Sequence, residues 1–505
     1  MNLRDLLHGV TAEPVAEVPV AGIACHSKQV RPGDLFVAIE GAAADGHAFM
    51  QEAIARGAAA VVAQRLPASW RTSGTATNGM AAREAASRPC PIVVVRDSRQ
   101  ALVTVARRFY GHPSRKLKMI GVTGTNGKTT TTYLLKSILE AAGVHAGLLG
   151  TIVYQIGGRA VPSTNTTPGP LELQRYFAQM AGEGLQWCAM EVSSHALAQG
   201  RIDGLELEAA VFCNLGSDHL DYHKTRDAYA AAKRRLFDYL RPGGTAVVNV
   251  DDDYGRVLAE TIPNRSVVTY GMSRPAKALA KDVHCTWHGT TFTLESPWGS
   301  LPITTPLLGR HNVWNMTASA ATVLALGISG DAVQKGLASM QEVPGRLERI
   351  PNDAGINIVI DYAHTADAMR LVLLSLRELT RGRLIVVFGC GGNRDQTKRP
   401  VMGKMASLLG DFVVLTSDNP RAENPADIIT QIRAGFPAHF SQFDVVPDRE
   451  QAIAVALAMA RRDDTVLIAG KGHEAYQMFD HITIPFSDRD MVERWVGGRQ
   501  PVSVS

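Results

Sequence analysis

A glycine-rich loop sets the local fold of this chain, because it separates an apolar run from a run with helical periodicity. The apolar run "LKMIGVTG" leads into "TNGKTT", and large apolar residues then recur at helical spacing until Gly143. A strand, a glycine loop and a helix in that order predict a phosphate site at the helix N-terminus. One glycine of the standard phosphate-binding loop is missing, because Val122 stands five positions before Gly127.

The loop favours ATP as the bound nucleotide. We expect Lys128 to meet the β- and γ-phosphates and the Thr129 hydroxyl to bind Mg2+. The alternative is a glycine turn that only caps a helix, which Gly-Lys-Thr-Thr after an apolar strand disfavours. No N-K-x-D motif supports a GTPase. The residues predicted to surround the phosphates, in part through outward-facing N–H groups, are Gly124, Thr125, Asn126, Gly127, Lys128, Thr129 and Thr130.

Composition indicates a globular enzyme. A chain of 505 residues exceeds one ordinary core, so we expect three domains. The net charge of +4 comes with scattered basic residues, which predicts no nucleic-acid partner. No apolar run approaches the ~20 residues of a membrane span, and the N-terminus lacks a signal-peptide pattern. We therefore expect a cytoplasmic monomer without membrane insertion, with its six separated cysteines reduced in the core.

Strand-like and helical runs alternate, which predicts an α/β chain with parallel sheets. We expect domains at residues 1–116, 117–343 and 344–505. Residues 65–91 are poor in large apolar side chains and rich in Ser, Thr, Gly and Pro, which predicts an exposed insertion. The predicted strands beyond the glycine loop are "WCAMEVSS", "LEAAVFCNL", "GGTAVVNVDD", "INIVIDYA", "RLIVVFGCGG", "DFVVLTSDNP" and "DTVLIAGKGHE".

Two candidate metal ligands follow predicted strands. Glu191 lies in "AMEVSSHAL" and His219 in "NLGSDHLDYH". The C-terminal ends of parallel strands bring such side chains to one crevice. A lone histidine is more often structural, which stays the alternative for His219. Lys233, in "YAAAKRRLF", is by itself typical of a helix-surface lysine.

Ten motifs in a fixed order together resemble the Mur ligases. The short glycine loop of that family, G-x-x-G-K-[ST], also accounts for the missing glycine. The motifs are "GVTGTNGKTTT", "STNTTPGPLELQ", "MEVSSHALAQGRIDG", "NLGSDHLDYHKT", "LLGRHNVWN", "VPGRLE", "IDYAHTADAM", "GCGGNRDQTKRP", "TSDNPRAENP" and "AGKGHEAYQ".

The resemblance implies a fold and a reaction. A small α/β domain that binds a UDP-sugar would precede a central P-loop ATPase, and a Rossmann-like C-terminal domain would bind an amino acid and close over the site. The implied ligase adds meso-diaminopimelate to UDP-N-acetylmuramoyl-L-alanyl-D-glutamate (UDP-MurNAc-L-Ala-D-Glu) in peptidoglycan synthesis. ATP would convert the D-Glu γ-carboxylate to an acyl phosphate, which the amine attacks, and Mg2+ would neutralise phosphate charge.

The resemblance also implies roles for residues outside the loop. Lys233 would be carbamylated (N6-carboxylysine), so that a carboxylate ligates a second Mg2+. The implied catalytic residues are Lys128, Glu191, His219 and Lys233, and the implied metal ligands are Thr129, Glu191, His219 and the Lys233 carbamate. Further ATP contacts would come from Asn312, Arg346 and Asp361.

Both other substrates have implied contacts. Around Ser27 the family commonly has Asp-Ser-Arg, and this chain has His-Ser-Lys, so the acidic and guanidinium neighbours are absent. The implied contacts of UDP-MurNAc-L-Ala-D-Glu are Ser27, Asn165, Thr166, Thr167, Ser193, Gln199 and Arg201. Those of meso-diaminopimelate are Arg394, Asp418, Asn419, Pro420, Arg421, Gly470 and Glu474.

Arg421 predicts the choice of amino acid. Its planar guanidinium suits the distal carboxylate that distinguishes meso-diaminopimelate from L-Lys. The alternative is that Arg421 only caps a turn with Asp418, since Asp-Asn-Pro-Arg is also good turn chemistry. Other functions remain open from the residues alone: a P-loop motor or regulatory ATPase, a non-catalytic nucleotide-binding module, a sister ligase that adds L-Lys, and a folylpolyglutamate synthetase.

Overall fold

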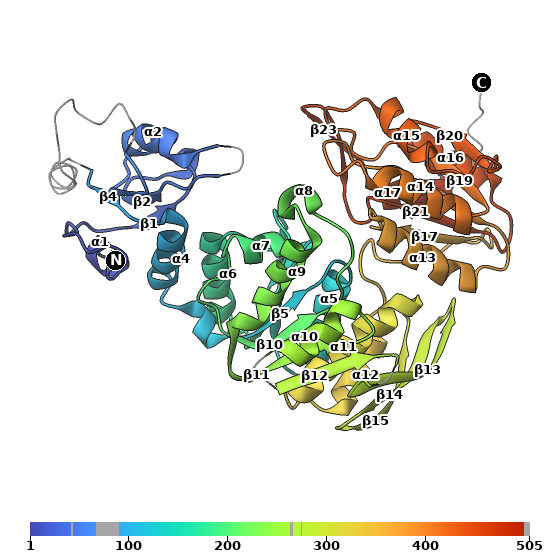
Figure 1. Ribbon diagram of the computed structural model, residues 1–505, viewed down its shortest axis with the longest axis horizontal. Coiled ribbons are helices and arrows are strands. Elements are labelled where there is room, and N and C mark those ends of the chain that lie inside the picture. The colour runs from blue at the N-terminus through green and yellow to red at the C-terminus, as the bar shows by residue number, and fades with distance from the viewer. Residues whose placement is uncertain (42–43, 67–89, 263–265, 274, 499–505) are drawn as a thin grey trace.

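The computed structural model describes residues 1–505 except 42–43, 67–89, 263–265, 274 and 499–505. The described residues form three α/β units that follow one another along the molecule, N-terminal, central and C-terminal (Figure 1). This arrangement confirms the expected three-domain α/β class. The insertion predicted at 65–91 falls mostly on 67–89, which lie outside the described residues.

The N-terminal unit contains a four-stranded parallel sheet in the order β1-β2-β3-β4. Separate apolar clusters line its two faces, one with Leu35 and Val62 and the other with Phe36 and Val61. Strands covered on both faces carry continuous apolar runs rather than alternating residues, as "LFV" in β2 and "AVVA" in β3 do. The elements are α1 (Leu3–Leu7), β1 (Gly22–Ala24), η1 (Ser27–Gln29), β2 (Asp34–Val37), η2 (Gly46–Phe49), α2 (Met50–Ala55), β3 (Ala60–Ala63), β4 (Ile92–Val94), α4 (Ser98–Phe109) and η4 (Pro113–Lys116).

The central unit contains an 11-stranded sheet in the order β15-β14-β13-β12-β11-β10-β5-β9-β6-β7-β8. From β12 to β6 the neighbouring strands are parallel, which confirms the predicted parallel sheet. The strands are β5 (Lys118–Thr123), β6 (Ala146–Leu149), β7 (Val153–Ile156), β8 (Arg159–Pro162), β9 (Trp187–Glu191), β10 (Leu207–Phe212), β11 (Leu240–Asn249), β12 (Ser266–Gly271), β13 (Ala278–Thr286), β14 (Gly289–Ser296) and β15 (Gly299–Thr305). The helices are α5 (Lys128–Ala141), α6 (Pro170–Gly182), α7 (Ser194–Ala198), α8 (Leu220–His223), α9 (Arg226–Arg234), η5 (Arg235–Tyr239), α10 (Asp253–Thr261), α11 (Arg310–Ala325) and α12 (Gly330–Ser339).

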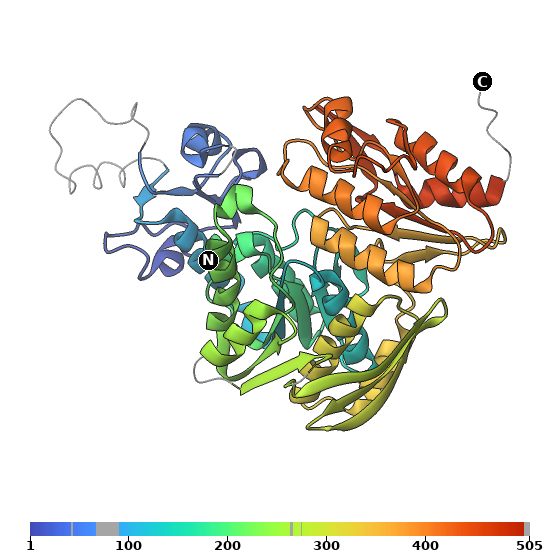
Figure 2. The same ribbon diagram turned by 45° about the vertical axis from the view of Figure 1, so that its right-hand side comes forward.

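Both edges of the central sheet are antiparallel, and the sequence patterns did not predict them. β13, β14 and β15 form a meander at one edge, and β7 and β8 extend the other. Figure 2 shows the meander as long twisted strands at the lower margin of the central unit. Much of β13 alternates between half-buried and exposed residues, because an antiparallel edge can leave one face in water.

The C-terminal unit contains a six-stranded sheet in the order β16-β17-β21-β18-β19-β20, parallel except for β16. The chain passes from β17 to β18 and later returns to place β21 between them, so the loops after these strands emerge side by side. The strands are β16 (Glu348–Ile350), β17 (Asn357–Asp361), β18 (Leu384–Phe388), β19 (Phe412–Leu415), β20 (Phe443–Val445) and β21 (Thr465–Ala469), with a hairpin of β22 (Tyr476–Phe479) and β23 (Ile482–Pro485). The helices are α13 (Ala366–Leu379), α14 (Lys398–Leu409), α15 (Pro425–Arg433), α16 (Arg449–Met459) and α17 (Asp488–Gly498).

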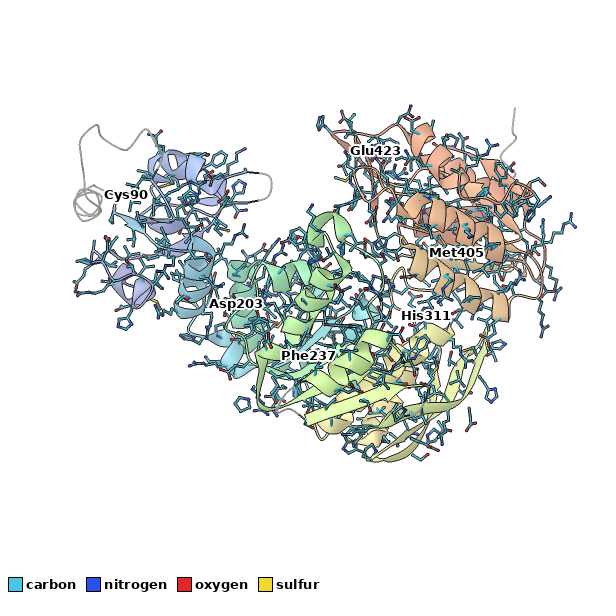
Figure 3. All side chains as sticks on the ribbon, viewed as in Figure 1. Cys90, Asp203, Phe237, His311, Met405 and Glu423 are labelled. Atoms are coloured by element: carbon cyan, nitrogen blue, oxygen red, sulfur yellow. The ribbon has the colours of Figure 1, made fainter. Side chains whose placement is uncertain are left out.

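Polar contacts join the units at the two boundaries where Figure 3 labels Asp203 and His311. Gln100 of α4 donates to Asp203 of the central unit at 2.5 Å. The His311 Nδ1 atom lies 3.1 Å from the Ser375 hydroxyl of α13. The backbone N–H of Ser217 also donates to Asp367 of α13 at 3.2 Å. The C-terminal unit is therefore seated on the loops of the central sheet.

The cysteines were expected to be reduced and buried in the core. All six cysteines are free thiols. Cys90, Cys188, Cys213 and Cys390 are buried, whereas Cys25 is exposed and Cys285 is half-buried, so the prediction of core cysteines is wrong for these two.

Within the described residues, no helix is long and apolar enough to cross a bilayer.

Candidate functional site

The glycine loop connects β5 to α5 and is shaped by close packing. A Cβ atom on Gly124 would lie 2.7 Å from the Cys213 Cβ, and one on Gly127 would lie 2.4 Å from the Asn315 side-chain oxygen. Both glycines have a positive φ, +157° and +89°. Side chains at these positions would therefore displace the loop, which explains the glycines better than a simple helix cap.

Two loop amides depart from the sequence prediction. The N–H groups of Thr125 and Asn126 donate to Asn214, at 3.0 and 2.9 Å, rather than facing outward. The first-turn amides of α5, from Lys128 on, remain at an open helix start, where no intrahelical acceptor exists. The anion-binding part of the loop is therefore its end, next to α5.

Lys128 and Thr129 are the first residues of α5. The Lys128 ammonium donates to the carbonyls of Gly124 and Thr125 at 2.9 and 3.0 Å. Burial lowers the pKa of Lys128, and the negative charge of Glu191 opposes that shift. The Lys128 side chain thus lies over the glycine loop, bonded to two of its carbonyls.

An arginine from the C-terminal unit reaches the glycine loop. Arg346, between α12 and β16, donates through Nη2 to the Thr129 hydroxyl at 3.1 Å, and its guanidinium lies 4.7 Å from the Tyr362 ring centroid. Its Nε atom is buried without a hydrogen-bond partner among the described residues. A buried guanidinium N–H beside a phosphate loop suits an anionic ligand.

The other two predicted ATP contacts are buried and hydrogen-bonded to protein atoms. Asn312 donates to the Leu308 carbonyl at 2.7 Å and accepts from Asn315 at 2.9 Å. Asp361, at the end of β17, accepts from the N–H groups of Leu347 and Ala363 at 2.7 and 2.8 Å. Burial raises the pKa of Asp361 to about 6, although Arg346 opposes the shift. Asp361 thus shapes the turn that carries Arg346.

Glu191 is held rigidly at the end of β9. Only 1% of it is exposed, and its two oxygens accept from the N–H and the hydroxyl of Thr151, at 2.7 and 3.0 Å. A Cβ atom on Gly150 would lie 2.4 Å from the Glu191 Oε1 atom. Glycine at position 150 is therefore required for this carboxylate geometry.

We expect Gly150→Ala to push the Glu191 carboxylate off Thr151 and to lower the free energy of unfolding by about 1–3 kcal/mol. Urea unfolding measures the change. Gly182→Ala at the end of α6 is the matched control, because a Cβ there meets no atom within 4 Å. Equal unfolding midpoints for the two variants would contradict the steric role of Gly150.

Lys233 is not the helix-surface lysine that its local sequence suggests. It is 1% exposed within α9, and its ammonium nitrogen lies 4.3 Å from the Tyr229 ring centroid. Burial, followed by the charge of Lys128, lowers the pKa of Lys233 well below its usual value, and Asp218 opposes the shift. The lysine is buried because its helix face packs inward together with Tyr229 and Ala230.

His219 precedes α8 with a left-handed backbone, φ +56°. Burial lowers its pKa, while the neighbouring Asp218 opposes the shift and Lys128 and Lys233 add to it. The imidazole is therefore neutral near pH 7. His219, Lys128 and Lys233 lie close enough to perturb one another, so the structure brings these predicted residues together.

The donor set around the loop fits Mg2+ in part. The Thr129 hydroxyl and the Glu191 carboxylate supply the oxygens that Mg2+ prefers, and a neutral His219 can ligate a cation. The Lys233 amine supplies no oxygen, so it fits only with an added carboxyl group. Among the described residues, no three His, Cys, Asp or Glu side chains gather as a metal-binding group.

Five residues predicted for the UDP-linked substrate join one hydrogen-bond network with Glu191. The Thr167 hydroxyl donates to the Glu191 carbonyl at 2.9 Å and accepts from the Ser193 N–H at 3.0 Å. Arg201 donates to the Thr167 carbonyl and to the Gln199 side chain, each at 2.9 Å. The Thr166 hydroxyl accepts from Thr151 at 3.1 Å.

Asn165 and Ser27 lie further from that network. Asn165 is exposed, and its backbone carbonyl accepts from the Tyr154 hydroxyl at 2.5 Å. Ser27 is buried in η1 of the N-terminal unit, and no hydrogen bond within the described part of the chain links its side chain to the central unit.

The residues predicted for the amino acid converge at the ends of β18, β19 and β21. Asn419 donates to Glu474 at 2.8 Å, and the Lys471 ammonium donates to both side chains, at 3.2 and 3.1 Å. A Cβ atom on Gly470 would lie 2.7 Å from an Asp418 carboxylate oxygen. The cluster is completed by Arg394, Pro420 and Arg421 on the same loops.

Arg421 is not the turn cap that the alternative interpretation required. Its Nη1 donates to the carbonyls of Gly392 and Asn419, at 2.8 and 3.5 Å, and no hydrogen bond to Asp418 occurs among the described residues. Burial raises the pKa of Tyr476, and the charges of Arg421 and Arg394 oppose that shift. Both guanidinium groups therefore lie near Tyr476, and among the described residues only Nη1 of the Arg421 guanidinium has a hydrogen-bond partner.

The sequence-based prediction missed several residues of the site. Lys471 is fully buried against Asn419 and Glu474, and Tyr362 donates to Glu474 at 3.3 Å. Asn214 holds two amides of the glycine loop. Lys471 lies between Gly470 and Gly472 in "AGKGHEAYQ", directly after an apolar strand, and that position could have marked it as a site residue.

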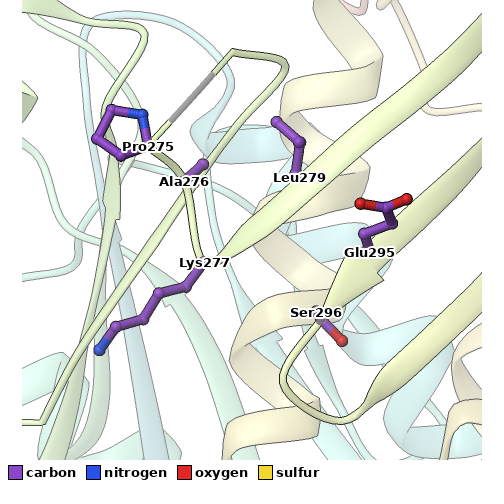
Figure 4. A pocket seen from close by; sticks show the side chains of 6 residues that line it. All are labelled: Pro275, Ala276, Lys277, Leu279, Glu295 and Ser296. Atoms are coloured by element: carbon purple, nitrogen blue, oxygen red, sulfur yellow. The ribbon is translucent and has the colours of Figure 1, made fainter.

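A separate cavity of about 460 Å3 lies between the start of β13 and the end of β14 (Figure 4). None of the predicted site residues lines it. The lining residues are Pro275, Ala276, Lys277, Leu279, Glu295 and Ser296.

Comparisons with known proteins agree with the geometry. A Mur ligase family catalytic domain matches residues 19–110, the Mur ligase middle domain matches 122–323, and a Mur ligase glutamate ligase domain matches 345–472. A UDP-N-acetylmuramoyl-L-alanyl-D-glutamate–2,6-diaminopimelate ligase of Geobacillus kaustophilus is 42% identical over 495 residues, 97% of each chain. A solved structure with the same name is 31% identical, with a TM-score of 0.67 over 99% of each chain. MurF from Acinetobacter baumannii, 21% identical with a TM-score of 0.66 over 93% of this chain and 95% of its own, shares the fold. The chain therefore belongs to the Mur ligase family.

Proposed function

We propose that this chain adds meso-diaminopimelate to UDP-MurNAc-L-Ala-D-Glu and converts ATP to ADP and phosphate. The observation that carries the proposal is the charged cluster of Arg421, Lys471 and Glu474, which lies in the unit whose Arg346 reaches the ATP loop at Thr129. Curated relatives that share about two-fifths of the sequence carry the name of this ligase. In this proposal the protein acts in the cytoplasm as a monomer.

The three units have separate roles in this proposal. Residues 1–116 bind the UDP moiety, with Ser27 as a contact, residues 117–343 bind ATP, and residues 344–505 bind the amino acid. The network of Thr167, Ser193 and Arg201 would hold the dipeptide end of the UDP-linked substrate beside Glu191. In this proposal the D-Glu carboxylate would lie close to the glycine loop.

The chemistry begins with the D-Glu γ-carboxylate attacking the γ-phosphorus of ATP, which forms an acyl phosphate and releases ADP. Mg2+ ions held by Thr129, Glu191 and His219, with a second ion on a Lys233 carbamate, would neutralise phosphate charge. Lys128 would contact the transferring phosphoryl group, and Arg346 would bind phosphate oxygens from the opposite side.

Amide formation follows at the crevice of the C-terminal unit. The substrate amine attacks the acyl carbon, gives up a proton and displaces phosphate, so no side-chain nucleophile is needed. Contact of Arg346 with Thr129 seats the C-terminal unit over the loop, which limits access of water to the acyl phosphate.

Selectivity would rest on Arg421 and Glu474. The free guanidinium N–H groups of Arg421 can meet the distal carboxylate bidentately, and Glu474 and Asn419 can meet the distal ammonium group. With L-Lys the remaining N–H groups of this partly desolvated guanidinium would have no carboxylate partner, so discrimination by a factor of about tens to thousands is expected.

The test is product formation by purified protein with UDP-MurNAc-L-Ala-D-Glu and ATP, with either meso-diaminopimelate or L-Lys, followed by mass measurement. We expect product with meso-diaminopimelate and little with L-Lys. Arg421→Ala should lose most activity with meso-diaminopimelate while the KM values for ATP and the UDP-substrate stay unchanged. Efficient addition of L-Lys at comparable concentrations would overturn the assigned amino acid and leave the ligase class intact. ATP hydrolysis that ignores both other substrates would instead indicate an ATPase.

A further inference from the structure

A second arginine, Arg399, is buried beneath the amino-acid crevice. It lies in the first turn of α14, and its side chain is fully buried, so it cannot touch a substrate. Its Nη1 and Nη2 donate to the two carboxylate oxygens of Glu423 at 2.8 and 3.0 Å, a bidentate pair. Further bonds go to Gln431 at 2.7 Å and to the Gly391 carbonyl at 3.1 Å.

This pair joins the two loops that carry Arg394 and Arg421. Arg399 binds the Gly391 carbonyl in the loop after β18, and Glu423 lies in the loop after β19. The Glu423 carboxylate also accepts from the Asn393 N–H. Figure 3 labels Glu423 in the C-terminal unit, at the end of that unit where Figure 1 labels β23.

The backbones of the two loops are also bonded directly. The Gly392 N–H donates to the Asn419 carbonyl at 2.9 Å, and the Ala422 N–H donates to the Asn393 side chain at 3.0 Å. Asn393 and Arg421 both have left-handed backbones, φ +52° and +51°. Such conformations persist only where their surroundings hold them, and the Arg399–Glu423 pair crosses between them.

We propose that Arg399 and Glu423 are a positioning pair, which sets the spacing of Arg394 and Arg421 and thereby selects an amino acid with a distal carboxylate. The inference rests on the proposed function. If Arg394 joins Arg421 on the distal carboxylate, donors from two loops meet one small group, and such an arrangement tolerates little displacement of either loop.

A purely structural role is the competing explanation. Arg399 Nε is buried without a hydrogen-bond partner among the described residues, and buried ion pairs add little net stability once desolvation is counted. A structural pair would change stability when broken, but it would leave the choice between two amino acids unaltered. Selectivity therefore separates the two explanations.

Arg399→Lys is the test variant, because lysine keeps the charge and cannot form two parallel bonds to Glu423. We expect the KM for meso-diaminopimelate to rise about ten-fold and its preference over L-Lys to fall by a similar factor. The KM values for ATP and UDP-MurNAc-L-Ala-D-Glu should not change. Glu423→Gln keeps the shape of the carboxylate, and it should also raise the KM for meso-diaminopimelate and lower the preference over L-Lys. It replaces Arg399→Lys as the test variant if Arg399→Lys does not fold.

Arg383→Lys is the matched control in the same domain. Arg383 binds Asp464 through Nε and Nη2, at 3.0 and 2.7 Å. The two residues directly precede β18 and β21, so they lie at the strand ends away from the amino-acid crevice. We expect this variant to lower stability without changing amino-acid selectivity. Equal effects of Arg383→Lys and Arg399→Lys on selectivity would overturn the proposal, as would unchanged selectivity in both Arg399→Lys and Glu423→Gln. If the unmodified protein itself prefers L-Lys, the proposed function fails instead.

Discussion

Lys128→Ala is expected to lower the rate of ATP-dependent ligation by at least about a hundred-fold. The Lys128 ammonium bridges the carbonyls of Gly124 and Thr125 and is the cation closest to the start of α5. Its loss removes a preorganised charge that the transferring phosphoryl group needs, and such groups contribute about 3–4 kcal/mol to the transition state. The loop itself should persist, because Asn214 holds the loop backbone without the lysine.

Phosphate release in the presence of all three substrates measures that loss, and thermal unfolding checks the fold. Lys136→Ala is the matched control on the same helix, since Lys136 forms an ion pair with Glu140 on the outer side of α5. The control should keep wild-type turnover. Retention of more than about a tenth of turnover by Lys128→Ala would contradict the placement of Lys128 on the phosphates.

Lys233→Ala is expected to be nearly inactive and to recover in part with acetate. Because burial lowers the pKa of Lys233, the amine is more readily neutral, and a neutral amine adds CO2 to form a carbamate with release of one proton. The product is a carboxylate in a position where the parent ammonium would repel a cation. Acetate can supply a carboxylate to the space that alanine leaves.

Mass measurement of intact protein and of peptides tests the modification, and turnover with and without acetate tests its role. Arg234→Ala is the control, because Arg234 is the next residue of α9 and faces solvent. It should keep its activity and show no response to acetate. Full activity of Lys233→Ala, with no added CO2 on Lys233, would exclude the carbamate.

Local patterns predicted the parts of the fold that depend on neighbouring residues. The glycine loop, the start of α5 and the central parallel strands lie where periodicity and glycine spacing placed them. The antiparallel edges β7–β8 and β13–β15 were missed, because edge strands of mixed polarity lack the apolar runs that mark buried parallel strands.

Burial of individual side chains was predicted less well. Lys233 and Arg399 both stand in stretches rich in lysine and arginine, a composition typical of exposed helix faces, and both are buried. In each case a carboxylate from outside the residue's own helix acts on the cation: Asp218 on Lys233, and Glu423 on Arg399. Such partners are brought close only by tertiary packing.

The sequence by itself determined the class of this protein, since its motifs specify a phosphate loop, three α/β units and the Mur ligase family. Tertiary structure alone decided how the units meet and how one crevice is assembled. Arg346 of the C-terminal unit reaches Thr129 across 217 positions, and within the C-terminal unit Asn419 meets Glu474 across 55. Glycine spacing and apolar periodicity act over a few residues, so they can be recognised directly in the sequence. The charge and geometry of a site depend instead on which strand ends are neighbours in the folded sheet.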